Sequence, residues 1–205
     1  MPASAIPTGG VRRLLFNGSV SDERARLFVA LELPERVVRE LVRWRQGAVE
    51  GIDGVRLVRP EDLHVTLCFL GSRLVREIEA IAGACQGVAA SGTAPLRVGE
   101  PIWLPRRRPR VLAVGLEDLE GALGRAQGTL AEALVNGGWY EPEGRQYLAH
   151  ATVARLGRAA RVPAARSRSI EAPRALTFEG ATVTLYRSRL SPKGARYEAL
   201  ASVAL

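Results

Sequence analysis

HVTLCFLG occupies residues 64–71, and HATVARLG occupies residues 150–157. Both segments fit the pattern His-x-Thr-aliphatic-x-x-Leu-Gly, so the chain contains one short motif twice. The chain has 2 histidines, and each of them begins one of these motifs. At the start of each motif, polar residues alternate with apolar ones, which predicts a β-strand with one buried face. Two copies of one motif indicate a duplicated fold.

The similarity between the two halves of the chain extends upstream of the motifs. Residues 26–33 and residues 110–117 are apolar runs typical of strands. Each run is followed by apolar residues at helical spacing, over 37–42 in the first half and over 119–134 in the second. Each half is therefore expected to contain a strand, a helix and a strand that carries the His-x-Thr motif.

The order of these elements predicts an α+β fold with two similar lobes. We expect two antiparallel sheets flanked by helices and related by an approximate two-fold axis, with the active-site cleft between them. Residues 1–24 have the composition of a flexible leader, and residues 25–205 are expected to form a single bilobal domain with repeat halves of about 26–105 and 106–205. The other expected elements are a helix over 73–90, a loop with some helix over 158–168, strands near 95–104 and 175–187, and hairpins over 101–116 and 182–205.

Composition narrows the class of protein. The formal net charge of +8 suits a phosphate-rich partner, although the positive charge is almost entirely arginine and is equally well explained as a compositional bias of the genome. No apolar run is long enough to span a bilayer. Cys68 and Cys85 cannot form a tetrahedral zinc site, and we expect reduced thiols in a cytoplasmic protein.

The motifs themselves suggest a chemistry. Residues i and i+2 of a strand point to the same face, so His64 projects with Thr66, and His150 with Thr152. If the lobes face each other, two imidazoles and two hydroxyl groups meet in one cleft. One imidazole can take a proton from an attacking water while the other gives a proton to a leaving oxygen, and the hydroxyl groups can bind phosphate oxygens. The alternative is a duplicated structural strand whose histidines are core groups.

These motifs resemble those of the two-histidine (2H) phosphoesterases, and most closely the branch of RNA 2′,3′-cyclic phosphodiesterases, also called bacterial 2′-5′ RNA ligases. The resemblance covers residues 26–205. It rests on the opening strand 26–31, the segment 58–71 around the first motif, the second motif at 150–155, and the closing segments 185–188 and 194–197. One residue departs from the family pattern, because Ala149 stands where this branch usually has proline.

The resemblance implies hydrolysis of RNA 2′,3′-cyclic phosphate ends to 2′-phosphomonoesters. We expect no metal or cofactor, because no acidic cluster stands beside the histidines. It implies that His64 is the proton donor and His150 the proton acceptor, although the near-symmetric repeat cannot itself order the two roles. Thr66, Thr152 and Arg155 are the candidate phosphate-binding residues. Strand parity points Arg155 away from His150, so a bulge or the end of the strand is needed to turn it inward.

Several secondary candidates come from the same segments. Phe69, beside the first motif, is the candidate for base stacking. Cys68 shares strand parity with His64, but we expect it to pack in the core. The run Arg106–Arg108 lies at an expected hairpin tip, where it either contacts RNA or is simply solvated.

The expected partners are RNA ends, with tRNA fragments as one candidate source, or nucleotides; we expect a monomer and no membrane partner. Three alternatives remain open. The same site can act on a small cyclic nucleotide-derived molecule or a 2′-5′ linked substrate. Weak 2′-5′ ligation is the reverse reaction. The third alternative is an RNA-binding module without catalysis.

Overall fold

The computed structural model describes residues 22–157, 160, 162, 170–191 and 194–205. Along the chain the elements are β1 (Arg24–Glu32), α1 (Glu35–Ala48), β2 (Val55–Leu57), the 3₁₀ helix η1 (Pro60–Asp62), β3 (His64–Leu74), η2 (Val75–Glu77), α2 (Ile78–Cys85), η3 (Gln86–Ser91), β4 (Ala94–Leu104), β5 (Val111–Asp118), α3 (Ala122–Asn136), β6 (His150–Leu156), β7 (Thr177–Gly180), β8 (Thr182–Ser191) and β9 (Gly194–Ala204).

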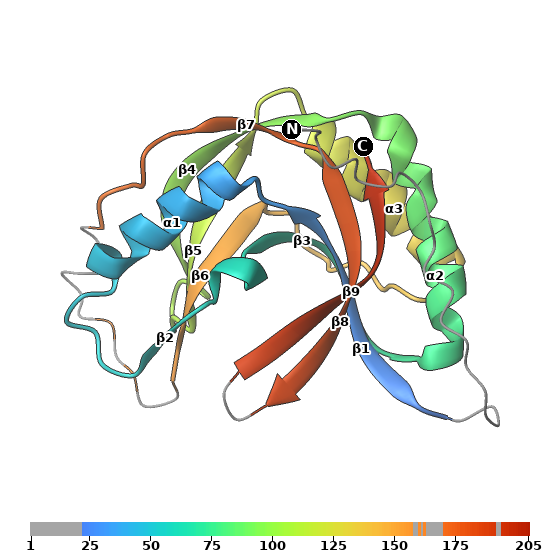
Figure 1. Ribbon diagram of the computed structural model, residues 1–205, viewed down its shortest axis with the longest axis horizontal. Coiled ribbons are helices and arrows are strands. Elements are labelled where there is room, and N and C mark those ends of the chain that lie inside the picture. Colours follow the sequence, from blue (N-terminus) through green and yellow to red (C-terminus); the bar gives the residue numbers. More distant parts are fainter. Residues whose placement is uncertain (1–21, 158–159, 161, 163–169, 192–193) are drawn as a thin grey trace, which may run out of the picture.

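The described strands form one curled antiparallel sheet (Figure 1). Its order is β7-β4-β5-β6-β3-β1-β8-β9, and β2 pairs with β6 outside this path. Equivalent strands of the two repeats lie at symmetric places in this order. The motif strands β6 and β3 lie at the centre, and β5 and β1, the first strands of the two repeats, lie outside them. Among the described residues, Val65 and Ala151 are the only pair that joins β3 to β6, so the sheet consists of two half-sheets joined at this point.

The α+β fold with two antiparallel half-sheets is therefore as predicted, except that the two sheets are continuous. Each half-sheet contains strands from both halves of the chain. β4, which precedes residue 105, pairs with β5, whereas β8 pairs with β1. Neither half of the chain contains all the strands of one half-sheet. On this ground we propose that residues 25–205 fold as a single domain.

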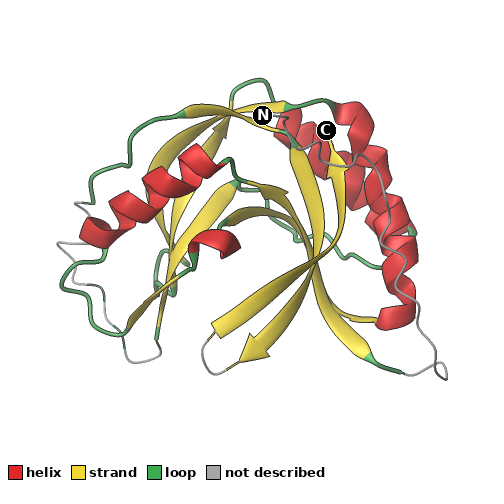
Figure 2. Ribbon diagram, in the orientation of Figure 1, coloured by secondary structure: helices red, strands yellow, loops and turns green. Residues whose placement is uncertain are grey.

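The helices α1 and α3 each contact a strand of the half-sheet that does not contain the strand before them (Figure 2). α1 follows β1, yet it contacts β6 in the other half-sheet. Its inner face carries Val37 and Leu41, both fully buried, as the helical spacing predicts. α3 follows β5, contacts β3 and lies beside α2. Each helix therefore packs against the motif strand of the opposite repeat.

Other parts of the sequence prediction need correction. The helix expected over 73–90 is shorter, because 73–74 belong to β3 and only 78–85 form the α-helix α2. Gly83 and Gly87 lower the helix propensity of this segment, which continues as the 3₁₀ helix η3. The strand expected near 175–187 is two strands, β7 and β8, which lie at different places in the sheet.

Both expected hairpins are present, as β4–β5 and β8–β9. Residues 192–193 of the second turn lie outside the described residues, as do 1–21 of the expected leader. So does most of segment 158–168.

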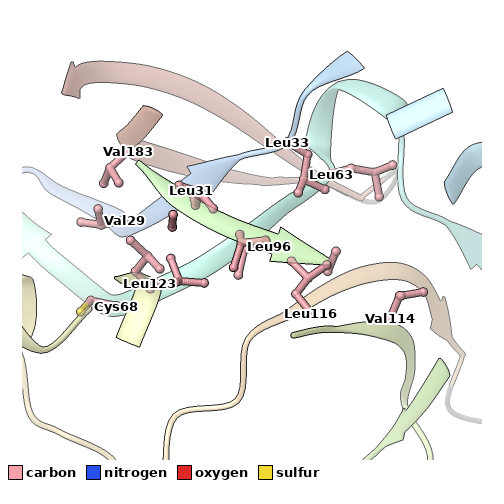
Figure 3. Packing of buried hydrophobic residues seen from close by; sticks show 14 of the residues in the cluster. Val29, Leu31, Leu33, Leu63, Cys68, Leu96, Val114, Leu116, Leu123 and Val183 are labelled. Atoms are coloured by element: carbon pink, nitrogen blue, oxygen red, sulfur yellow. The ribbon is translucent and has the colours of Figure 1, made fainter. Parts of the chain in front are cut away.

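One hydrophobic core runs through both half-sheets. Figure 3 shows Val29 and Leu31 of β1 near Leu96 of β4 and Leu123 of α3, and the same cluster extends to Val114 of β5. Since buried apolar side chains pack at nearly crystalline density, this core fixes the angle between the half-sheets. It thereby fixes how closely the motif strands β3 and β6 approach each other.

Candidate active site

The two motif strands have the same burial pattern. In β3 and in β6 the histidine and the threonine are half-buried, and the residue between them is buried. Two consecutive buried residues follow, Leu67–Cys68 in β3 and Val153–Ala154 in β6, and then an exposed one. A regular strand cannot bury two consecutive side chains on one face, so each strand contains an irregularity at this point.

The register of the sheet identifies these irregularities as β-bulges. In β3, Thr66 pairs with Ala30 and Cys68 with Val29, which leaves Leu67 as the extra residue. In β6, the extra residue is Val153, between partners of Ala113 and Leu112. The two bulges therefore lie at equivalent positions of the repeat. Each one inverts the strand parity of the residues that follow it.

The bulges determine which side chains lie on the same face of the strand as the histidines. Phe69 and Arg155, at equivalent positions, are turned to the cleft face, so the bulge that Arg155 required is present. Cys68 is turned the other way and is 1% exposed, as expected for a packed thiol. Burial raises the pKa of this thiol to about 12, so Cys68 is not a nucleophile at neutral pH.

Both imidazoles are held in the same way. His64 Nδ1 lies 2.7 Å from the carbonyl oxygen of Asp62, and His150 Nδ1 lies 2.8 Å from that of Leu148. A carbonyl oxygen can only accept, so each Nδ1 must carry the hydrogen. Both rings therefore present Nε2 to the cleft. The Asp62 carboxylate is fixed in turn by two hydrogen bonds, of 2.7 and 2.8 Å, from Arg59.

The two motifs meet in one cavity of about 40 Å³. Its lining contains both motif histidines and both threonines with Arg155, and also Val58, Asp62 and Tyr197. The antiparallel pair Val65–Ala151 places His64 diagonally from His150 across the join. Such diagonal positions lie about 7–8 Å apart in a sheet, which leaves room for a small group between the rings.

The two histidines differ in their surroundings. The His64 ring lies against Phe28 and Tyr197, with ring centroids 4.9 and 5.3 Å away. Burial lowers the pKa of His64 to about 4; the bond to the Asp62 carbonyl opposes this shift, and the electrostatic effect of Arg155 and His150 adds to it. His64 is therefore neutral at pH 7 in the unliganded protein. Its Nε2 lies 3.2 Å from Thr66 Oγ1, which can donate to it.

Larger cavities adjoin the histidine pair on two sides. One, of about 290 Å³, is lined by Arg26, Arg56 and Arg155 together with His64. The other, of about 410 Å³, is lined by His150 and by mostly uncharged residues, among them Tyr140, Gln127 and Leu104. Phe69 is 44% exposed and lines both cavities. The structure therefore offers space for a phosphate between the rings and for larger groups on either side.

Sequence reasoning did not find every residue of this site. Asp62 and Leu148 were missed because they act through backbone oxygens, although both stand two residues before a histidine. The contact of Tyr197 with His64 could not be predicted, because it depends on the β8–β9 hairpin returning to β1. Arg106–Arg108 lie in an exposed loop and line none of these cavities. Among the described residues, no group of three or more His, Cys, Asp or Glu side chains is arranged to hold a metal ion.

The profile of the family described as LigT like Phosphoesterase matches residues 31–112. A protein of Archaeoglobus fulgidus named RNA 2′,3′-cyclic phosphodiesterase is 31% identical over 178 residues, which is 85% of this chain and 97% of that protein. The chain belongs to the LigT-like phosphoesterase family. A Thermus thermophilus protein with the same name is 34% identical and covers 88% of this chain and 90% of its own length.

Solved structures agree with this membership in the LigT-like family. A crystal structure of a Thermus thermophilus protein has a TM-score of 0.72 and 30% identity, covering 88% of this chain and 97% of that one. Escherichia coli LigT complexed with 3′-AMP also has a TM-score of 0.72, at 24% identity, covering 89% and 99%. The latter similarity is one of fold. The phosphoesterase chemistry predicted from the two motifs thus agrees with the family.

The low pKa of His64 predicts a specific pH dependence of stability. The unfolded chain binds a proton at this residue near pH 6.5, whereas the folded protein does so only near pH 4. Stability is therefore lost as the pH falls from about 6.5 to 4, by up to about 1.4 kcal/mol per pH unit. Urea unfolding of the wild type and of His64→Gln across this range measures the effect. Parallel stability curves for the two proteins would contradict the assignment.

Proposed function

We propose that this phosphoesterase hydrolyses RNA 2′,3′-cyclic phosphate ends to 2′-phosphomonoesters. The observation that carries the proposal is the single cavity in which His64, His150, both motif threonines and Arg155 meet. A cyclic phosphate placed there has an imidazole Nε2 on each side, which an in-line displacement with acid and base needs. The names of the curated relatives support RNA as the substrate.

In the proposed mechanism His150 accepts the proton of the attacking water, and His64 donates a proton to the leaving 3′-oxygen. His64 is neutral in the unliganded protein, so it must gain a proton when substrate binds. The negative charge of the phosphate favours this, because it offsets the positive charge of Arg155, which lowers the pKa of His64. Thr66 then turns its hydroxyl from His64 to the phosphate. No cofactor takes part in these steps.

Phosphate oxygens gain charge as the water attacks. The Thr66 and Thr152 hydroxyls and the Arg155 guanidinium line the same cavity as the imidazoles and can donate to these oxygens. Phe69 forms a wall of the larger, mostly uncharged cavity, and we propose that it stacks on the terminal base there. The bulges in β3 and β6 make this division of roles possible, since they place Phe69 and Arg155 on the cleft face.

A second substrate class is compatible with the same site. A small cyclic nucleotide-derived molecule or a 2′-5′ linked oligonucleotide presents the same phosphorus to the two imidazoles. Weak 2′-5′ ligation is the reverse reaction, with a 5′-hydroxyl in place of water. A binding module without catalysis is less well supported, because RNA binding alone does not need both Nε2 atoms turned to one cavity.

We propose further that the protein acts as a cytoplasmic monomer. A single copy of the chain supplies both histidines, both motif threonines and Arg155 to the catalytic cavity, so a second copy is not needed to complete it. Cys68 and Cys85 are buried free thiols, which is typical of a reducing compartment. No helix among the described residues has the length and apolar character that crossing a membrane requires.

The direct test uses RNA with a 2′,3′-cyclic phosphate end, in a buffer containing EDTA. The wild type should release a 2′-phosphomonoester. His64→Gln and His150→Gln should each lower kcat by roughly 10²–10⁴-fold, because each removes one proton-transfer group. Product analysis and initial rates measure both effects. Formation of the 3′-monoester, or full activity in either variant, would refute the proposed mechanism.

The threonine roles have their own test. Thr66→Val and Thr152→Val keep the shape of the side chain and remove its hydroxyl donor. Each should lower kcat by about 10²-fold if the hydroxyl stabilises the developing charge. Thr177→Val, on the exposed side of β7, is the matched control and should have the wild-type rate. Equal rates in all three variants would exclude the threonines from the mechanism.

A further inference from the structure

We propose that the cavity beside His64 contains a second anion subsite, built around Arg56 and Arg26, which binds the phosphodiester group preceding the terminal nucleotide of the RNA. The inference rests on the proposed function and adds to it. It assigns to this subsite the selection of RNA ends over free cyclic mononucleotides, because a cyclic mononucleotide has no second phosphate.

The first observation is continuity with the catalytic cavity. The cavity of about 290 Å³ and the catalytic one are both lined by His64, Thr66, Arg155 and Tyr197. A chain that leaves the reacting phosphate on this side must therefore enter the larger cavity. Its far wall consists of β2 and the β8–β9 hairpin, with Arg56 facing Gly194. A Cβ atom at Gly194 would lie 3.6 Å from Cζ of Arg56, so the hairpin closes directly over this guanidinium.

The second observation is uncompensated positive charge. Three arginines, Arg26, Arg56 and Arg155, line this cavity, and none of its described lining residues is acidic. Eight of the 22 described arginines form ion pairs with carboxylates, and none of these three is among them. No described carboxylate lies within ion-pair distance of these three. A bound anion is the natural counter-charge for such a cluster.

The third observation is the register between β2 and β6, in which Arg56 is the direct partner of Arg155. Like charges opposite each other in an antiparallel pair destabilise the sheet, and no described carboxylate forms an ion pair with either arginine. Residues paired in this way point to the same face, so Arg56 faces the cleft together with Arg155. Since Arg155 is assigned to the reacting phosphate, Arg56 is placed to contact the next phosphate along the chain.

Arg26 completes the subsite from the opposite side. It projects from β1 and is exposed, and its Cζ lies 4.6 Å from the centroid of the Phe69 ring. Arg26 lines the cavity of about 290 Å³ beside His64 and does not line the cavity of about 410 Å³ beside His150. It therefore covers the face of Phe69 that is turned to the smaller of these two cavities. The other face of Phe69 is then left for the terminal base, and Arg26 is positioned beside the phosphate attached to that nucleotide.

The test compares three substrates with the same 3′-terminal nucleotide. They are cytidine 2′,3′-cyclic phosphate, a dinucleotide ending in that group, and the same dinucleotide with an uncharged methylphosphonate linkage. The wild type should have about tenfold higher kcat/KM on the charged dinucleotide than on the other two. Arg56→Gln should lose this preference, with a much smaller effect on the cyclic mononucleotide. Arg39→Gln, an exposed arginine on α1, is the matched control and should keep it.

The outcomes separate the two proposals. Equal losses by Arg56→Gln on all three substrates, or no loss on any, would overturn the subsite. If the wild type hydrolyses none of them, the proposed function fails, and the subsite is then tested by binding alone. Calorimetry of cytidine 2′-phosphate and of the dinucleotide that ends in it should show about tenfold tighter binding of the dinucleotide, abolished in Arg56→Gln. Equal affinities in the wild type would overturn the subsite there too.

Discussion

The site depends on the join between β3 and β6, where Val65 pairs with Ala151 at the centre of the sheet. Antiparallel pairing at this one point sets each histidine beside the threonine of the other motif. The join is held from behind by a core to which both half-sheets contribute, including Val29, Leu96 and Val114. The helices α1 and α3 add to this constraint, because each of them contacts the motif strand of the other repeat. The distance between the two imidazoles is therefore a property of the whole fold.

Duplication gives the site its symmetry, and a few substitutions remove it. Both copies keep the histidine, the threonine and the bulge, and both hold Nδ1 through a backbone oxygen two residues upstream. The position turned inward by the bulge is aromatic in one copy, Phe69, and cationic in the other, Arg155. His64 is also enclosed by aromatic rings, which lowers its pKa. The two imidazoles thus differ although the strands that carry them are alike.

Much of this arrangement could be predicted from the sequence, because the repeated His-x-Thr pattern and the strand–helix–strand order are local features. The α+β fold, the hairpins and the common face of His64 and Thr66 follow from side-chain periodicity. The bulges do not, since Leu67 and Val153 become extra residues only when a neighbouring strand sets the register. Arg56 could not be found either, because its place opposite Arg155 depends on the short strand β2 joining the edge of β6.

The central claim is that both imidazoles present Nε2 to one phosphate. Because the chain has 2 histidines, long-range ¹H–¹⁵N spectra can follow each ring separately. Titration with a nucleoside 2′-phosphate should shift both Nε2 signals with one dissociation constant, while both Nδ1 atoms keep their hydrogen and His64 Nε2 gains a proton. A response confined to one ring, or a His64 ring with its hydrogen on Nε2 and none on Nδ1, would contradict the account.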